Sequence, residues 1–244
     1  MHSPTLDATQ PLFYAATTGH HHDLIALLNE NADASMTNIH LDTPLHRAAA
    51  NGQLKCVQIL ADHPSSHIDA QNIFGNTPLH EAALSAYTKI IGVLIKKSAS
   101  VNKRNKSNST PLICAALNGH KESLEALLEA GADPNVVNYF GLSALDCALY
   151  SGSLHAVYLL LQHDAIIRDT SSLQTFLSKQ NPSDPKVVFC LDALKKQEAE
   201  LTEKNVVPMR DRLFKPRERP SQITRYETET SSTLGFAKQF YLNE

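Results

Sequence analysis

One seven-residue stretch recurs along the chain and restricts its possible folds more than any other feature. The stretch begins at Thr43, Thr77 and Thr110, and weaker copies begin at Gln10 and Ser143. Each copy starts 33 or 34 residues after the one before it. A unit of this length that recurs several times predicts a solenoid, in which each unit covers the apolar face of its neighbour.

Each copy has the features of a short helix. Thr43 is a typical capping residue, and Pro44 suits a first helical position because that position needs no N–H bond within the helix. The leucine and the alanines of the stretch share one helical face. A glycine seven residues after the leucine, such as Gly119, ends the helix. A second, leucine-rich helix follows, then a turn such as residues 131–135, then an extended hairpin-like finger such as residues 136–141.

These residues together resemble the ankyrin repeat. The resemblance lies in the proline–leucine core, the paired alanines, Gly119-His120, the Gly-Ala-Asp turn at residues 131–133, and the 33-residue period. It implies an all-α fold, an ankyrin-repeat solenoid of helix-turn-helix units with hairpin-like fingers. Residues 1–6 are expected to be an N-terminal extension, and residues 7–167 to hold five repeats. The expected repeats are residues 7–37, 38–70, 71–103, 104–136 and 137–167.

The resemblance also implies a structural role for two histidines. In ankyrin repeats the motif threonine and histidine typically bond to each other, as Thr43 with His46 and Thr77 with His80. The fourth copy has Ile113 at the histidine position. The fifth copy has Ser143 and Asp146, and the first has Gln10 and Phe13. We therefore expect His46 and His80 to brace turns rather than to act as general bases.

The sequence after the repeats changes character twice. Residues 168–204 are expected to form a degenerate helical capping repeat that covers the last repeat. Asp184 and Pro185 are a good cap and first position for a helix, and Val187, Val188, Leu191 and Leu194 predict its apolar stripe. Residues 205–244 are expected to be a Pro- and Arg-containing linker and tail. Docking of residues 221–244 on the repeats is one expectation for the apolar end of that tail.

Composition limits the cellular compartments and the classes of partner that are expected for this chain. The net charge is −3, which provides no strong attraction to nucleic acid, and no apolar run approaches the roughly 20 residues of a membrane helix. The four cysteines, Cys56, Cys114, Cys147 and Cys190, are widely spaced and are expected to be reduced core thiols. The residues from Met1 to Gln10 lack a secretory signal pattern. A cytoplasmic protein is expected.

The sequence offers no pattern that predicts catalysis. Adjacent histidines, His20, His21 and His22, do not share a helical face as metal ligands on a helix do. The cysteines have no evident histidine partner, and the glycines form no phosphate-binding loop. We expect no catalytic residue, no cofactor and no metal site.

The resemblance implies a protein-binding surface on the concave face, made by the fingers and the exposed side of the first helices. Structural positions are fixed by the core, so specificity is expected at the remaining positions. The expected partner-binding residues are Ile39, His40, Arg47, Phe74, Glu81, Ser85, Lys103, Arg104, Asn118, Tyr139, Phe140 and Tyr150. Leu41, Ile73 and Lys106 on the fingers and Tyr14 and Asn51 on the helices belong to the same surface.

The function expected from this surface is a non-enzymatic scaffold or adaptor that recruits a partner protein. Three alternatives remain open. One is an ankyrin effector of an intracellular bacterium, exported into the host-cell cytosol or nucleus through a C-terminal signal, to which residues 226–230 and the apolar end bear a loose likeness. Another is a regulator associated with nucleic acid through the basic run of residues 210–219. The last is an enzyme with an unrecognised site.

Overall fold

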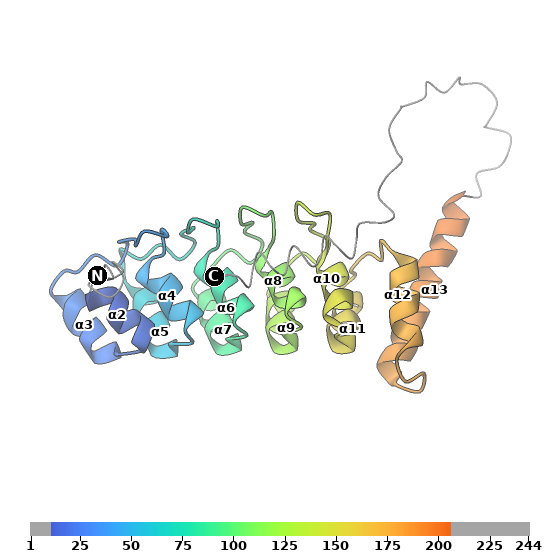
Figure 1. Cartoon of the computed structure of the whole chain (residues 1–244), viewed down its shortest axis with the longest axis horizontal. Helices are drawn as coiled ribbons and strands as arrows, with labels where there is room; N and C mark the ends of the chain where they lie inside the picture. The colour runs from blue at the N-terminus through green and yellow to red at the C-terminus, as the bar shows by residue number, and fades with distance from the viewer. Residues whose placement is uncertain (1–10, 206–244) are drawn as a thin grey trace, which may run out of the picture. The chain divides into compact units, whose positions relative to one another are not determined.

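The computed structural model describes residues 11–205, with side chains for residues 11–200. Twelve helices and no strands occur in this part of the chain, which confirms the predicted all-α fold (Figure 1). The chain divides into two compact units, one ending at Ile166 and the other beginning at Ile167. The predictions for residues 1–6 and for the tail, including the docking of residues 221–244, concern parts of the chain outside the described residues.

The first unit contains five helix pairs, which we call repeats one to five. The first helices are α2 (Pro11–Thr18), α4 (Pro44–Ala50), α6 (Pro78–Leu84), α8 (Pro111–Leu117) and α10 (Ala144–Ser151). The second helices are α3 (His21–Asn29), α5 (Leu54–Asp62), α7 (Thr88–Lys96), α9 (Lys121–Glu129) and α11 (Leu154–Gln162). Each first helix contacts the second helix of its own pair.

The repeated stretch determines where each first helix begins and ends. Thr43 has an extended backbone (φ −86°, ψ 165°) and its hydroxyl accepts a bond from the His46 N–H, while Pro44 starts α4. At the other end, Gly52 and Gly152 adopt left-handed conformations, as predicted. Ala86 holds the same conformation (φ 60°) where the third copy lacks the glycine. These caps keep every first helix to seven or eight residues.

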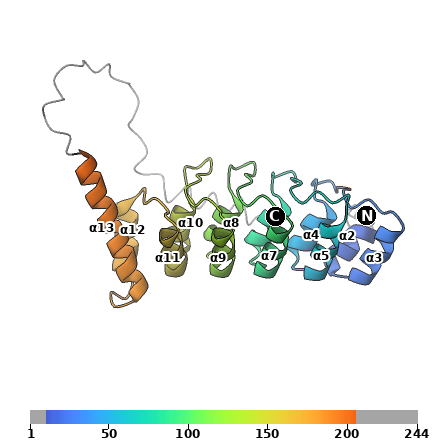
Figure 2. The same cartoon turned by 180° about the vertical axis from the view of Figure 1, so that it is seen from behind.

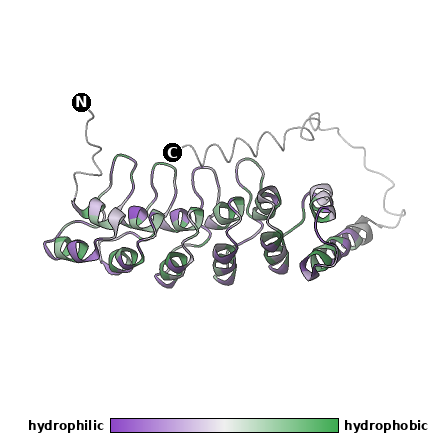
Figure 3. Ribbon diagram, turned by 60° about the horizontal axis from the view of Figure 1, so that its bottom comes forward, coloured by the Kyte–Doolittle hydropathy of each residue, from purple (hydrophilic) through white to green (hydrophobic). Residues whose placement is uncertain are grey.

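The first helices form one layer and the second helices form another, and each layer is continuous from one end of this unit to the other. Each first helix contacts the next first helix, and each second helix contacts the next second helix. The fingers rise from one side of the stack, as Figures 1 and 2 show from opposite directions. In Figure 3 the helices carry both hydrophobic and hydrophilic colour, as expected for elements with one buried face.

The core consists of the residues that recur at the repeat period. The motif leucines and alanines are almost fully inaccessible to solvent, from Leu12 and Ala15 to Leu145 and Ala148. Leu60 and Leu94 on the second helices are completely buried. Alanines are needed between first helices because only a small side chain allows the backbones to approach closely. This core holds the fingers at a constant spacing.

The turns that leave the second helices are also linked to one another. Asn102 accepts a bond from the Asp133 N–H (2.8 Å), and Asn135 accepts one from the Ile166 N–H (2.8 Å). In repeat two, which has one extra residue in this turn, Leu60 O accepts from the His63 N–H three residues later. The matching leucine carbonyls of the other four repeats accept from an N–H five residues later. The insertion is thus absorbed locally.

The second unit contains α12 (Thr170–Ser178) and α13 (Pro185–Asn205), which contact each other. Asp184 caps α13 as predicted, with its carboxylate accepting the Lys186 N–H (2.8 Å). The predicted apolar stripe was wrong at Val188, which is 46% exposed. Cys190 is buried instead, because positions three and seven residues after Val187 share its helical face.

Candidate protein-binding face

The four fingers, residues 36–43, 70–77, 103–110 and 136–143, are built around one buried asparagine each. In finger three, Asn105 Oδ1 accepts the Ser107 N–H (3.0 Å) and the Ser109 N–H (2.9 Å). The side chains of Asn38, Asn72 and Asn138 make the equivalent pairs of bonds. Sequence reasoning missed these asparagines, although their regular spacing of 34, 33 and 33 residues was visible.

Backbone hydrogen bonds tie each finger to the next. The Ile73 N–H donates to His40 O (2.8 Å), the Lys106 N–H to Phe74 O (2.9 Å), and the Tyr139 N–H to Ser107 O (3.0 Å). In each bond, the donor directly follows its finger's asparagine, and the acceptor is the second residue after the asparagine of the preceding finger. Fingers two and three are therefore held from both sides, and fingers one and four from one side each.

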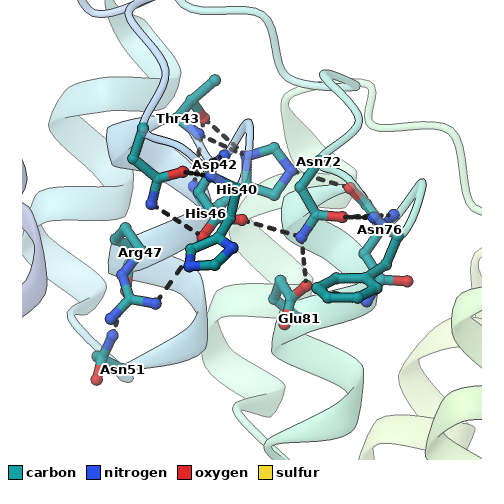
Figure 4. Close-up of polar contacts among 11 residues, drawn as sticks. His40, Asp42, Thr43, His46, Arg47, Asn51, Asn72, Asn76 and Glu81 are labelled. Carbon is teal, nitrogen blue, oxygen red and sulfur yellow. Dashed lines mark hydrogen bonds and ion pairs between the residues drawn. The ribbon is translucent and has the colours of Figure 1, made fainter. Parts of the chain in front are cut away.

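A chain of polar side chains joins the first three fingers and α6, and Figure 4 shows its part from Asp42 to Glu81. The Asn72 amide donates to Asp42 Oδ1 (2.9 Å) and to Glu81 Oε1 (3.1 Å), and the Asn76 amide donates to the same Glu81 oxygen (3.0 Å). The Asn105 amide then donates to Asn76 Oδ1 (2.8 Å). Buried polar groups are stable in a fold when they find such partners, so this chain links repeats two, three and four.

Two of the predicted contact residues belong to this polar chain. Glu81 is half-buried and accepts two amide bonds, and Arg47 lies 3.9 Å from Asp42 through Nη1. Burial raises the pKa of the Glu81 carboxyl, and the bond from Asn76 opposes that rise. Both side chains already have internal partners.

The two predicted bracing histidines join successive repeats. The Thr43 N–H donates to His46 Nδ1 (3.1 Å), so Nε2 carries the proton and donates to Asn76 O (2.9 Å). His80 repeats this arrangement with the Thr77 N–H (3.1 Å) and Ser109 O (3.1 Å). Burial lowers the pKa of both imidazoles, that of His80 to about 4. Both act as neutral structural groups, as predicted.

The next two copies of the motif have a different residue at the histidine position. Ile113 in α8 is almost fully buried and cannot form such a bond. In α10, the Asp146 carboxylate accepts the Ser143 N–H (2.8 Å) and so completes a capping box within its own repeat. The fold therefore accepts an apolar side chain or a local helix cap at this position. In repeats two and three, the histidine at this position bonds to the next repeat.

The expected partner-binding residues separate into two groups by exposure. Exposed are Ile39, His40, Ser85, Lys103, Arg104, Tyr139, Phe140 and Tyr150. Half-buried are Arg47, Phe74, Glu81 and Asn118. The Asn118 amide donates to Cys114 O (3.2 Å) on its own helix. The exposed group lies mainly on the fingers, and we call its surface, together with Phe74, the finger face.

Tyr139 is the most exposed large apolar side chain among residues 11–200, at 77%. Phe140 beside it and Tyr150 on α10 are 39% and 40% exposed. At the opposite end of the stack, Ile39 and Leu41 are 61% and 49% exposed. Exposed aromatic side chains on a rigid backbone are typical of interface anchors.

Among the described residues, the candidates for chemistry are metal-ligating side chains and the four cysteine thiols. Within residues 11–200, no group of three or more His, Cys, Asp or Glu side chains is arranged to hold a metal ion. All four cysteines are buried and unpaired, as predicted. Burial raises the pKa of every cysteine thiol, for example that of Cys147 to about 12. Such thiols are poor nucleophiles. None of the described helices is both long enough and apolar enough to cross a membrane.

Comparison with known proteins agrees with this geometry. A family model described as ankyrin repeats (three copies) matches residues 2–72, 65–138 and 103–171, which together cover well over half of the chain. No curated protein matches the sequence closely enough to suggest a particular partner or activity. Ankyrin repeats are generally modules for protein–protein interaction. The chain belongs to the ankyrin-repeat family.

Proposed function

We propose that the chain is a non-enzymatic scaffold or adaptor, which binds a partner protein through its finger face. The observation that carries the proposal is the 77% exposure of Tyr139 on a finger whose backbone is fixed by bonds to Asn138 Oδ1 and Ser107 O. An aromatic ring held in solvent on a rigid element loses little conformational entropy when a partner covers it.

The rest of the finger face supports the same function. Tyr150 on α10 is also exposed, and Phe74 lies two fingers away from Tyr139. Arg104, between them, is exposed and its guanidinium Nη1 is 3.3 Å from Asn108 Oδ1. Aromatic and arginine side chains dominate the binding energy of many protein interfaces. Cytoplasmic placement and the effector alternative remain predictions, because they depend on residues outside those described.

The test compares partner capture by two variants of the intact chain. In the first, Phe74, Arg104, Tyr139 and Tyr150 are replaced by alanine. In the control, exposed residues of the second helices, Ile25, Lys55, Lys89 and Lys121, are replaced by alanine. We expect specific partners to be lost from the first variant and retained by the control, with similar urea-unfolding midpoints. Full retention by the first variant would show that the finger face is not the binding surface.

A further inference from the structure

Three cations on finger three have no ion-pair partner among residues 11–200. Lys103, Arg104 and Lys106 are all exposed. The ion pairs formed within residues 11–200 do not include any of the three. In contrast, Arg47, which points from α4 in repeat two, lies near Asp42. The three positive charges of finger three are thus not paired with a carboxylate within this part of the chain.

The backbone beneath these cations is held on both sides. The Lys106 N–H donates to Phe74 O in finger two, and Arg104 O accepts a bond from the Gln71 amide (3.0 Å). On the other side, the Asn108 amide donates to Val137 O (2.8 Å) in finger four. Backbone and amide groups of the finger are thus used internally. The ammonium groups of Lys103 and Lys106 and the guanidinium N–H groups of Arg104 that do not donate to Asn108 are left to bind a ligand. Such preorganisation lowers the entropic cost of binding.

Aromatic side chains stand on the fingers at either side of the cations. Tyr139 donates its backbone N–H to Ser107 O and exposes its ring, while Phe74 accepts from Lys106 and is half-buried. Fingers two and four contain no Lys, Arg, Asp or Glu. Along three successive fingers, the surface therefore presents an aromatic side chain on finger two, cations on finger three and an aromatic side chain on finger four.

We propose that this part of the finger face binds an extended, acidic segment of a partner protein, with glutamates or aspartates on finger three and an apolar side chain against Tyr139. The inference rests on the proposed function, because it specifies the chemistry of the partner for that surface. Stacked helices lie about 8–10 Å apart and an extended chain advances about 3.3 Å per residue. One repeat therefore corresponds to about three residues of the bound segment.

The charge distribution favours a protein segment over a nucleic acid. The positive charge is confined to one finger, and the chain as a whole has a net charge of −3. Nucleic-acid binding usually spreads phosphate contacts over an extended basic surface, and often uses about 6–10 of them. A short acidic run flanked by an apolar residue needs only the width of the three fingers.

The probe is a fluorescein-labelled peptide in which a run of glutamates stands about three residues from a pair of leucines. A second peptide has the reverse order, and glutamine versions of both serve as controls. We expect one of the glutamate peptides to bind the full chain about tenfold more tightly than its glutamine version. This preference should shrink as NaCl is raised from about 50 mM to about 300 mM, because salt screens exposed charges.

Two charge-reversal variants of the full chain test the location. The first carries Lys103→Glu, Arg104→Glu and Lys106→Glu. The control carries Lys55→Glu, Lys89→Glu and Lys121→Glu, which make the same change in net charge on the second helices. The finger variant should bind the glutamate peptide about tenfold more weakly, and the control should bind it nearly as the unmodified chain does. Tyr139→Ala should also weaken binding.

Several results would overturn the proposal. Equal affinity for glutamate and glutamine peptides would do so, as would equal losses in the two charge-reversal variants. Tighter binding of a single-stranded oligonucleotide, lost in the finger variant alone, would assign the surface to nucleic acid. Tighter peptide binding after Glu227→Gln and Glu229→Gln in the full chain would assign it to the chain's own tail. If the peptide fails while the alanine variant still loses its captured partners, the partner chemistry is wrong and the proposed function stands.

Discussion

Two junctions in the stack differ in what their side chains do. One lies between repeats two and three, and the other lies between repeats four and five. Their fingers have the same pattern of hydrogen bonds, but their side chains serve different purposes. At the earlier junction, the Asn72 amide donates to both Asp42 and Glu81, and His46 donates to Asn76 O across the repeats. At the later junction, Ile113 replaces the histidine, and Tyr139 is 77% exposed on the finger above it. Each finger is nevertheless folded around its asparagine and bonded to the preceding finger.

The difference separates two roles that charged and aromatic residues have in this fold. Arg47 and Glu81 look like contact residues in the sequence, yet they take part in interactions that hold the stack together. Tyr139 and Lys103 have no comparable internal bonds from their side chains among residues 11–200. We therefore expect changes at the earlier junction to alter stability and changes at the later fingers to alter binding.

The largest expected effect is at the histidine position. His46→Leu keeps an apolar volume but leaves the Thr43 N–H without its acceptor and removes the donor to Asn76 O. We expect the free energy of unfolding in urea to fall by about 2–3 kcal/mol. Ile113→Leu, at the matching position of repeat four, should cost about 1 kcal/mol or less, because it preserves volume in an apolar site. Equal losses would remove the contrast between the two junctions.

The same histidines should make stability depend on pH. An unfolded chain protonates histidine near its ordinary pKa of about 6.5, whereas burial keeps folded His80 neutral until about pH 4. Between these values the unfolded state binds more protons, so the free energy of unfolding should fall as pH falls through this window. His46 shifts in the same direction. Urea unfolding of His46→Leu at several pH values should show a shallower dependence, and an unchanged slope would contradict this account.

An effect of similar size is expected at one of two finger glycines. Gly75 (φ 74°) would place an added Cβ 2.6 Å from the Lys106 backbone nitrogen, in the middle of a bond between fingers. Gly141 has nearly the same φ of 75°, with no atom within 4 Å of the added Cβ. We expect Gly75→Ala to cost about 2–3 kcal/mol and Gly141→Ala about 1 kcal/mol, the cost of the left-handed backbone alone. Thermal unfolding of both variants would measure the difference, and equal costs would show that the fingers are not closely coupled.

The smallest effect is expected at Glu81→Gln. Burial, reinforced by the charge of Asp42, raises the pKa of this carboxyl, so ionised Glu81 costs stability as pH rises through its folded pKa. Glutamine keeps an oxygen to accept the Asn72 and Asn76 amides without the charge. We expect stability at pH 7 to stay within about 1 kcal/mol of the unmodified chain, or to rise. A loss as large as that of His46→Leu would mean that the negative charge itself holds the junction.

Much of the fold was predictable because it repeats. The leucines, alanines and glycines at a fixed period specify the helices and their ends, and Thr43 and Pro44 specify the cap. The exposure of the finger residues followed from their place between helices. The bonds between fingers were not predictable, because they join backbone atoms of residues about 32 or 33 positions apart, such as Lys106 and Phe74.

Other features could not be predicted for physical reasons. The helical position of Glu81 predicts exposure, but its hydrogen-bond partners Asn72 and Asn76 come from the preceding finger, and Glu81 is half-buried. The apolar character of Val188 predicts a core position. Val188 is exposed because it lies outside the buried helical face that contains Val187. The finger asparagines recur at the repeat spacing, which could have identified them. They are not part of a helical or strand pattern, because their side chains bond within a turn.

The most direct test of the central claim measures binding and stability together on two single variants of the full chain, Tyr139→Ala and His46→Leu. Binding is titrated with the glutamate peptide, and the free energy of unfolding is measured in urea. The account predicts that Tyr139→Ala weakens binding about tenfold and changes stability by no more than about 0.5 kcal/mol. For His46→Leu it predicts the reverse, a loss of about 2–3 kcal/mol with nearly unchanged affinity wherever the protein remains folded. Unchanged affinity in Tyr139→Ala, or a loss of stability as large as that of His46→Leu, would contradict it.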